Sequence, residues 1–247
     1  MYKSLLSSDE AISLRHLKHY LNRYDKFLVI PEDLDFSDPD FDGIRRFPSA
    51  YFESRATYSR LLLSEKFYSA FSDYEYILCY QLDCLVFSDQ LGEWCSKGYD
   101  YIGAPWFKRP GLGWNYTGPE RAGNGGFSLR HVEHSIDAIR RSNQTGLGDV
   151  VRAVAELRSG WFHADLKRAL LLKRYAATTY PHNEDIWWSY AQNYMSEFRV
   201  APVEVAVKFA FETNPQYCFE RNGRQLPFGC HGWNRYQRAF WQQYLLR

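Results

Sequence analysis

The chain has 247 residues, of which 45% are hydrophobic and 18% aromatic, and its formal net charge is +1. This length allows one α/β domain with a sizeable core, and the near-zero charge excludes a global field that would attract nucleic acid. Five cysteines without a close pair indicate a reducing compartment, and neither a signal peptide nor a run of 18 apolar residues is present. We therefore expect a single cytoplasmic domain over residues 1–247 with no nucleic-acid partner.

The first part of the chain carries local signals for helices and a strand. Ser7 and Glu10 form a capping-box pattern, which predicts the start of a helix. A short strand is expected at Phe27–Ile30, and the spacing of apolar residues favours a long helix over Ser49–Phe71.

The stretch from Tyr74 to Ser88 contains a continuous apolar run, which is typical of a strand buried on both faces. Gln81 and Asp83 follow this run and point the same way if the chain stays extended. A carboxylate at the end of a buried strand is costly unless something pairs with it, so a divalent cation that carries a phosphate is one natural partner. An Asp in an ordinary turn fits the spacing equally well.

Further elements are predicted in this order: a helix capped by Ser88 that ends at Gly98, a strand at Tyr101–Gly103, and a strand at Phe127–Arg130 that runs into a helix at His131–Arg141. The aperiodic segment Lys108–Gly123 is longer than an ordinary connection and indicates a functional loop. His131 and His134 have no third ligand nearby in the sequence and are interpreted as surface residues. Gly125 and Gly126 match no dinucleotide or P-loop template, but they would let the backbone approach a ligand closely.

Glu184 and Asp185 follow Asn183, which looks like the N-cap of an aromatic helix. Acids in a first turn stabilise a helix by ~0.3–1 kcal/mol, and the helix dipole favours their ionised form. They would therefore be proton acceptors at neutral pH, although weakly basic ones. His231 lies in an aromatic loop, where a structural role and a metal-binding role both remain open.

Two segments, one basic and one aromatic, suggest possible contacts with a membrane or with a second copy of the protein. Asp149–Tyr175 combines basic and apolar residues at helical spacing, which fits a solvated helix face or a membrane-surface contact. Near the end of the chain, aromatic and apolar residues line up on an expected terminal helix: Tyr236, Phe240, Trp241, Tyr244 and Leu245. This helix would pack on the domain, form a homodimer contact or lie against a membrane.

Five motifs together resemble a bacterial family of GT-A-type glycosyltransferases known mainly as a domain of unknown function, and their order is similar to that of Fringe-like enzymes. The motifs are YEYILCYQLDCLVF at Tyr74–Phe87, YDYIGAPW at Tyr99–Trp106, GNGGFSLR at Gly123–Arg130, NEDIWW at Asn183–Trp188 and FGCHGW at Phe228–Trp233. The resemblance implies an α/β, GT-A-like (Rossmann-like) mixed sheet flanked by helices. Relatives begin with a strand before the segment that matches Tyr2 and Lys3, and we expect this strand to be missing here.

The resemblance also implies roles for particular residues. Asp83 and His231 would bind Mn²⁺ or Mg²⁺, although Gln81 stands where such enzymes usually carry the first Asp of an Asp-x-Asp motif. Asp185 would remove the proton from the acceptor hydroxyl, with Glu184 as its substitute. The nucleotide diphosphate sugar would be contacted by these residues: Arg60, Gln81, Asp83, Gly125 and Gly126.

The expected function is a metal-dependent, inverting transfer of a sugar to a glycan or lipid-linked acceptor. Bacterial surface polysaccharide synthesis, such as that of lipopolysaccharide, at the inner face of the membrane is the setting that the resemblance implies. Gln81 and the missing strand motivate an alternative, a catalytically inactive GT-A-like carbohydrate-binding or scaffolding protein. A metal-dependent phosphate hydrolase fits the acids but not the glycine segment.

Overall fold

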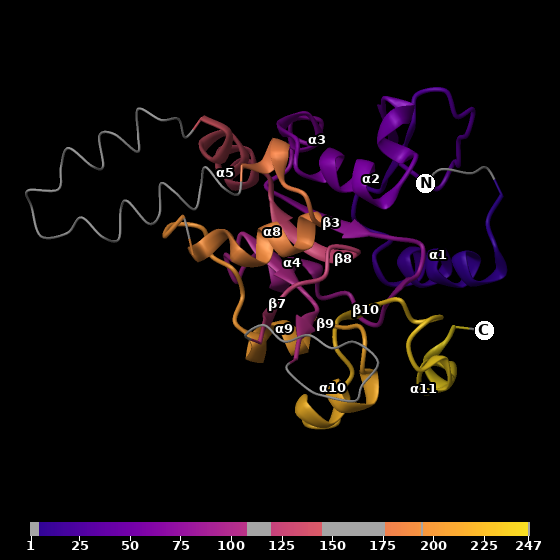
Figure 1. Cartoon of the computed structure of the whole chain (residues 1–247). Coiled ribbons are helices and arrows are strands. Elements are labelled where there is room, and N and C mark those ends of the chain that lie inside the picture. Colours follow the sequence, from indigo (N-terminus) through magenta and orange to yellow (C-terminus); the bar gives the residue numbers. More distant parts are fainter. Residues whose placement is uncertain (1–4, 108–119, 145–175, 194, 247) are drawn as a thin grey trace, which may run out of the picture.

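The computed structural model describes residues 5–107, 120–144, 176–193 and 195–246. They form a mixed α/β structure in which helices cover small sheets (Figure 1). The expected functional loop at Lys108–Gly123 falls mostly outside the described residues, and the basic segment Asp149–Tyr175 falls wholly outside them.

The described strands form four small sheets. Their members are β1 (Phe27–Pro31) with β2 (Gly43–Phe47); β3 (Tyr76–Tyr80), β8 (Phe127–His131) and β5 (Tyr101–Gly103); β4 (Cys84–Val86), β10 (Gly229–His231) and β9 (Ala210–Phe211); and β6 (Pro105–Trp106) with β7 (Arg121–Ala122). The α/β class is as expected, but one continuous mixed sheet is not observed. A turn closed by the hydrogen bond from Cys84 N to Gln81 O (2.9 Å) leads the chain from the β3 sheet into the β4 sheet.

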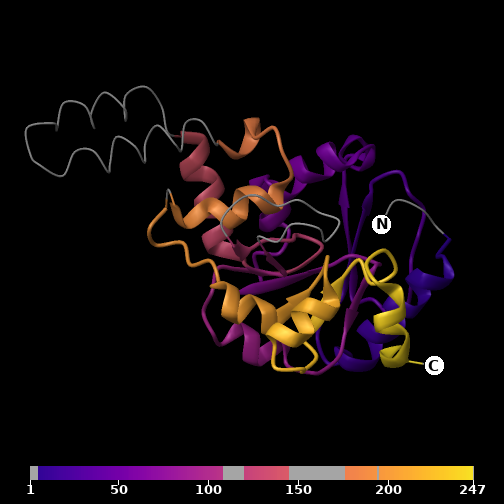
Figure 2. The ribbon, with the colours of Figure 1, turned by 60° about the horizontal axis from the view of Figure 1, so that its bottom comes forward.

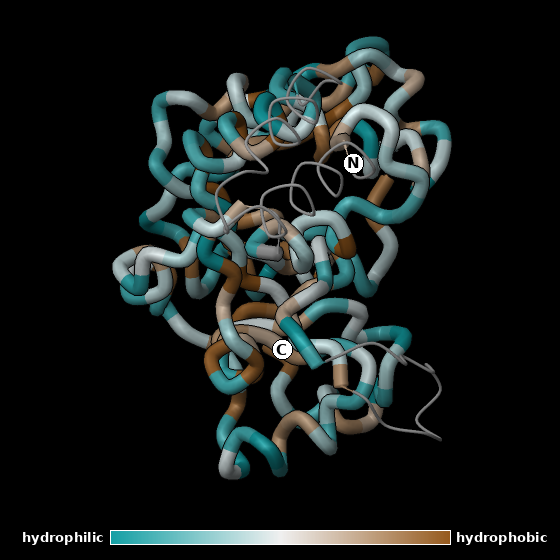
Figure 3. The backbone as a smooth tube through the Cα atoms, turned by 60° about the vertical axis from the view of Figure 1, so that its left-hand side comes forward, coloured by the Kyte–Doolittle hydropathy of each residue, from teal (hydrophilic) through white to brown (hydrophobic). Residues whose placement is uncertain are grey.

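Helices lie on both sides of β3 and β8 (Figures 1 and 2). On one side are α2 (Arg55–Leu62), α3 (Glu65–Ser69), α5 (Val132–Gln144) and α8 (Glu184–Tyr190), whose buried residues share one hydrophobic cluster. On the other side are α1 (Ser8–Tyr20), α4 (Leu91–Cys95) and α9 (Val203–Phe209), which share a second cluster. The remaining helices are α10 (Pro215–Arg221), α11 (Arg238–Trp241) and the 3₁₀ turns η1 (Ser49–Phe52), η3 (Ala177–Thr179), η4 (Ala191–Asn193) and η5 (Gln242–Tyr244). Figure 3 shows hydrophilic stretches of the backbone mainly around the outside of the molecule.

The expected long helix over Ser49–Phe71 is divided into three short elements. Ser54 caps α2 by accepting a hydrogen bond from Thr57 N, and Ser64 caps α3 by accepting one from Phe67 N. Serine side chains compete for backbone groups in this way and so favour helix starts over helix interiors. Several local predictions are confirmed: the Ser7 capping box, the strand at Phe27, and the passage from β8 into α5. Ser88 does not cap α4, whose N-cap residue is Gln90.

The strand β3 was expected to be buried on both faces, but every residue of β3 is only part-buried. A cavity lies beside β3 and accounts for this exposure. The following strand β4 is buried throughout, because β10 pairs with it and α1 packs on it.

The C-terminal helical turns pack on the domain beside α1, as both views show (Figures 1 and 2). Arg238 donates two hydrogen bonds to Asp9 at 2.7 and 2.8 Å, and the Trp233 indole N–H donates to Ser13 at 2.9 Å. Trp241 is fully buried. The sequence left three possibilities for this segment: packing on the domain, a homodimer contact or a membrane contact. The structure shows it packed on the domain. Among the described residues, no helix has the length and apolar character needed to cross a membrane.

The division of the expected long helix yields a stability prediction. Replacing Ser54 by Ala should lower the free energy of unfolding by about 1 kcal/mol, because the N–H of Thr57 loses its capping partner. Urea unfolding measures the change. Ser69→Ala is the matched control, since Ser69 is an exposed helical serine in α3, and equal losses in the two variants would contradict the capping role.

Candidate functional site

Strand register brings polar side chains from distant segments to one point. Gln81 directly follows β3, and its N–H donates to Gly126 O at 2.9 Å, which extends the pairing of β3 with β8. His231 lies opposite Cys84 in the pairing of β10 with β4, and Asp83 is the residue before Cys84. Gln81, Asp83 and His231 therefore meet at the turn between β3 and β4.

The imidazole of His231 is the centre of this cluster, and its side chain is only 9% exposed. Its Nε2 lies 3.2 Å from Gln81 Oε1 and 3.3 Å from Asp83 Oδ1. Its Nδ1 lies 2.9 Å from Oε1 of Glu212, the residue that follows β9. A carboxylate on one ring nitrogen fixes the orientation of the ring and directs the other nitrogen, as happens at metal-binding histidines.

Three atoms at this point fit a divalent cation: Gln81 Oε1, Asp83 Oδ1 and His231 Nε2. Oxygen ligands with one imidazole suit Mn²⁺, and carboxylate and carbonyl oxygens suit Mg²⁺. The thiol of Cys84 also lies close, but burial raises its pKa well above the usual value and it donates to Gly126 O at 3.2 Å. It is therefore a protonated thiol at neutral pH and not a ligand for such a cation.

Charges within the cluster compensate one another. Burial lowers the pKa of His231, but the hydrogen bonds with Asp83 and Glu212 and their charges outweigh this and raise it to about 9. Burial alone would raise the pKa of Asp83, but the His231 hydrogen bond and the charges of His231 and Arg235 hold it below its usual value. Arg235 Nη2 lies 2.5 Å from Asp83 Oδ2, so a guanidinium already neutralises one oxygen of this carboxylate.

Asn124 supports the histidine from the glycine segment before β8. Its Nδ2 donates to Glu212 Oε1 at 2.7 Å, and its Oδ1 accepts from Phe127 N at 3.2 Å. The backbone of Asn124 has φ 33°, in the left-handed region that Asn tolerates better than most residues. This conformation and the buried side chain fix Glu212 beside His231.

The two predicted glycines make room for protein side chains. A Cβ atom on Gly125 would lie 2.1 Å from Glu184 Oε1, and one on Gly126 would lie 2.3 Å from His231 Nε2. Both distances are far below van der Waals contact, so neither position accepts a larger residue without displacing a site residue. Close approach to a ligand, which the sequence suggested, is therefore not needed to explain these glycines.

Glu184 is engaged in a buried ion pair and is 6% exposed. Its Oε1 lies 3.2 Å from Nη2 of Arg130, which is fully buried on β8, and its Oε2 accepts from Ser59 Oγ at 3.0 Å. These contacts fasten the start of α8 to β8 and α2. Both carboxylate oxygens of Glu184 are occupied by contacts that hold α8 in place. The geometry therefore does not favour Glu184 as a catalytic base in place of Asp185.

Asp185, the next residue, is part-exposed and its Oδ1 accepts from Ile186 N at 2.7 Å. Burial, the charge of Glu184 and the charge of Glu212 raise the pKa of Asp185 to about 7. The sequence predicted a strongly ionised, weakly basic carboxylate at a helix start. The helix dipole is outweighed here, because desolvation and two neighbouring acids all favour the protonated form.

Arg60, predicted to face a donor phosphate, is exposed on α2, and no described contact joins it to the cluster. Arg55, at the start of the same helix, lines the cavity that Gln81, Asp83 and Arg235 also line.

A second metal-capable group, Asp100 with His131 and His134, lies away from this cavity. There Asp100 accepts a hydrogen bond from the N–H of Arg199 (2.6 Å) and pairs with His134 Nδ1 (2.6 Å), so it joins the start of β5 to α5.

Glu212, Asn124 and Arg130 are site residues that the sequence reasoning missed. Glu212 had a usable signal, because it directly follows the short apolar run Phe209–Phe211, much as Asp83 comes soon after the run of β3. Arg130 had none, since a basic residue in a predicted strand is ordinarily expected to face solvent.

Asp185 gives a prediction about the pH dependence of stability. Its carboxyl group binds a proton more tightly in the folded state, with a pKa of about 7, than in the unfolded state, for which the reference value is 3.8. The folded protein should therefore lose stability as pH rises from about 4 to about 7, and Asp185→Asn should abolish a loss on the order of a few kcal/mol. Urea unfolding at pH 4.5, 6 and 8 measures this, with Asp73→Asn as a control for the removal of one exposed charge. Parallel curves for the wild type and Asp185→Asn would contradict the raised pKa.

The buried ion pair gives a second prediction. Glu184→Ala should lower the free energy of unfolding by about 3–5 kcal/mol, because Arg130 would keep a buried and uncompensated charge. The double variant Arg130→Met with Glu184→Leu should recover much of this loss, since both charges are then absent. Equal stability of Glu184→Ala and the exposed control Glu133→Ala in urea unfolding would show that the pair is unimportant.

Comparison with known proteins gives one match. No curated protein and no solved structure matches the chain. A family model described as "Protein of unknown function (DUF5672)" matches residues 43–231. This range runs from β2 to the end of β10 and contains Asp83, Asp185, Glu212 and His231. The chain therefore belongs to the DUF5672 family of proteins of unknown function.

Proposed function

We propose that this protein is a metal-dependent glycosyltransferase with a GT-A-like arrangement, which moves a sugar from a nucleotide diphosphate sugar to a hydroxyl group of a glycan. The observation that supports this most is a pair of features that Glu212 links, since it contacts His231 and its charge acts on Asp185. Asp83, Gln81 and His231 present atoms that fit a cation, and Asp185 is a carboxyl group with a pKa of about 7 that senses the charge of Glu212. A cation site and a tuned proton acceptor are what sugar transfer from a diphosphate requires.

In this proposal Asp83 Oδ1, Gln81 Oε1 and His231 Nε2 hold Mn²⁺ or Mg²⁺. When bound, the cation supplies a Lewis acid that neutralises charge on the diphosphate leaving group. Glu212 keeps His231 in position through Nδ1, and Asn124 keeps Glu212 in position. Arg235 contacts Asp83 and is 47% exposed at the side chain, so its guanidinium is available to the phosphates when it leaves the carboxylate.

Asp185 is the proposed base. Its ionised carboxylate accepts the proton of the acceptor hydroxyl while that oxygen forms a bond to the anomeric carbon of the sugar. The bond from the anomeric carbon to the diphosphate oxygen breaks, and its electron pair leaves with the nucleoside diphosphate. A pKa of about 7 makes Asp185 a stronger base than an ordinary carboxylate and still leaves much of it ionised at neutral pH. A single displacement of this kind inverts the anomeric centre.

The wider setting of the proposal depends on the family resemblance. It comprises a lipid-linked or glycan acceptor, work at the inner face of the bacterial membrane, and surface polysaccharide synthesis. A homodimer through the C-terminal segment belongs to the same expectation, although Trp241 is buried within the domain and Tyr236, Phe240 and Tyr244 are half-buried.

A second candidate function is a non-catalytic, carbohydrate-binding relative of such enzymes. One observation favours it: Arg235 neutralises Asp83, so the cluster is electrically satisfied by the protein's own residues. Calorimetry separates the two, because this candidate predicts no heat with any nucleoside diphosphate in the presence of Mn²⁺.

The proposed transfer predicts that some variants lose nucleotide binding, whereas others keep binding and lose only catalytic activity. Asp83→Asn and His231→Ala should each remove Mn²⁺-dependent binding of nucleoside diphosphates, as measured by calorimetry with UDP, GDP, ADP and CDP. Asp185→Asn should keep this binding but lower donor hydrolysis or transfer by about 10²–10⁴-fold, the usual contribution of a general base.

Asp137→Asn, an exposed acid on α5, is the control with unchanged activity. Arg60→Ala should also keep nucleotide binding, because Arg60 lies apart from the cluster, whereas a loss would restore the role that the resemblance assigns to it. Full activity of both Asp83→Ala and Asp185→Ala would remove the mechanism.

A further inference from the structure

The guanidinium of Arg235 lies against the atoms that fit a divalent cation. Its Nη2 is 2.5 Å from Asp83 Oδ2 and 3.4 Å from His231 Nε2. The other oxygen of the same carboxylate, Oδ1, is 3.3 Å from that ring nitrogen. A positive charge of the protein's own therefore contacts two of the three residues whose atoms fit the cation.

Few contacts hold the side chain of Arg235 in this position. It is 47% exposed, and within the described ranges its guanidinium has hydrogen bonds and ion pairs with Asp83 and His231 alone. Arg130, which pairs with Glu184, is in contrast fully buried. Exposed side chains change rotamer rapidly, so the guanidinium of Arg235 can leave once its two partners are taken by another cation.

The backbone at Arg235 is fixed, so its side chain can move alone. The N–H of Arg235 donates to Gly232 O at 3.0 Å, and the N–H of Trp233 donates to Asp83 O at 3.2 Å. Gly232 has φ 64°, and a Cβ atom there would lie 2.7 Å from the ring of Tyr236. This tight turn keeps Arg235 beside Asp83 whichever direction the guanidinium takes.

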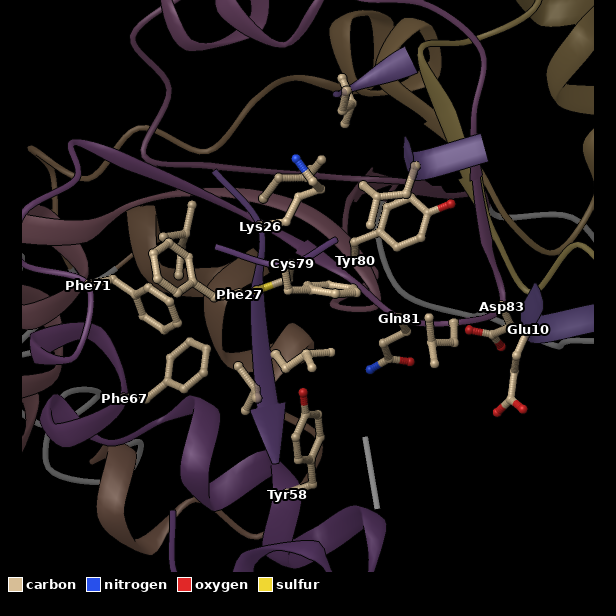
Figure 4. A pocket seen from close by; sticks show the side chains of 18 of the residues that line it. Glu10, Lys26, Phe27, Tyr58, Phe67, Phe71, Cys79, Tyr80, Gln81 and Asp83 are labelled. Atoms are coloured by element: carbon tan, nitrogen blue, oxygen red, sulfur yellow. The ribbon is translucent and has the colours of Figure 1, made fainter. Parts of the chain in front are cut away.

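The cavity beside β3 offers the guanidinium a second place. Arg235 lines this cavity of about 1120 Å³ together with Arg55, Gln81 and Asp83. Figure 4 shows Gln81, Asp83 and Glu10 at one end of the cavity and aromatic rings at the other. Two guanidinium groups in the wall suit an anionic ligand, because guanidinium donates in pairs to phosphate and carboxylate oxygens.

Arg235 and a divalent cation exclude each other. A cation held by Gln81 Oε1, Asp83 Oδ1 and His231 Nε2 would lie next to the guanidinium, and like charges this close repel, most strongly where water is partly excluded. Cation binding therefore requires Arg235 to give up its ion pair. An anion in the cavity lowers this cost, since it gives the released guanidinium a new partner. Such coupling is reciprocal, so cation and anion should each raise the affinity for the other.

We propose that Arg235 is an exchangeable internal cation, which covers Asp83 and His231 in the empty site, gives way to a divalent cation, and then binds the diphosphate of a nucleotide ligand. Cation and diphosphate bind cooperatively in this scheme, and the cation binds weakly alone. The inference rests on the proposed function for the identity of the two ligands, but it does not depend on the transfer of a sugar.

The first test is the binding of Mn²⁺ alone, measured by calorimetry on the full chain. Arg235→Gln should bind Mn²⁺ at least about tenfold more tightly than the wild type, because no guanidinium has to be displaced. Arg235→Lys, which keeps a positive charge, should bind it as weakly as the wild type. Adding Asp83→Asn to Arg235→Gln should abolish the gain and so locate the cation.

Arg140→Gln is the matched control for the loss of one positive charge. The side chain of Arg140 lies on α5 and is 48% exposed, close to the value for Arg235. This variant should bind Mn²⁺ as the wild type does. Circular dichroism verifies that each variant is folded.

The second test measures the coupling between the two ligands. At least one of UDP, GDP, ADP and CDP should raise the Mn²⁺ affinity of the wild type about tenfold or more, after correction for Mn²⁺ bound by the free nucleotide. Arg235→Gln should lose most of this rise, because the residue that passes from one ligand to the other is absent.

The outcomes separate this inference from the proposed function. Equal Mn²⁺ affinity of Arg235→Gln and the wild type would overturn the exchange, even where the wild type binds a nucleotide together with Mn²⁺. An undiminished rise in Arg235→Gln would overturn the contact with the diphosphate. Tighter Mn²⁺ binding by Arg235→Gln with no nucleotide binding by either protein would overturn the proposed function, whereas the exchange of Arg235 for a cation would stand.

Discussion

The imidazole of His231, held between the carboxylates of Asp83 and Glu212, is the interaction on which the candidate site depends. Each carboxylate is largely removed from water, and an isolated charge there would be costly. A proton on the ring compensates both, which explains why the pKa of His231 is raised although the residue is buried, and a cation bound at Nε2 would take the place of that proton. The three strands β4, β10 and β9 must keep their register for this contact to exist, because a slip of one residue would turn His231 to the opposite face.

The two neighbouring acids at the start of α8 illustrate how environment divides roles. Glu184 meets a buried guanidinium and a hydroxyl, so its charge is used to hold α8 in place. Asp185 has no such cation partner among the described residues and is surrounded by other acids, so its proton is held more tightly. A carboxyl group whose pKa is raised toward neutrality by its surroundings is a recurrent basis for acid and base chemistry.

Sequence reasoning predicted the elements that neighbouring residues determine. The Ser7 capping box, β5, β8 and the start of α5 all follow from local patterns, and they are where the sequence placed them. The division of the strands into separate sheets did not follow, because it depends on which distant segments pair. Glu212 and Arg130 were missed for the same reason: their partners lie 19 and 54 residues away in the sequence.

The cavity beside β3 and the candidate site share three residues, Gln81, Asp83 and Arg235. The elements that line the cavity nevertheless differ from those that hold His231, Glu212 and Asn124. His231 lies on β10, Glu212 follows β9 and Asn124 precedes β8, whereas β1, β3 and the helices α1, α2 and α3 line the cavity. A molecule that fills the cavity would therefore meet Gln81, Asp83 and Arg235 directly, while His231, Glu212 and Asn124 are held by contacts outside the cavity wall.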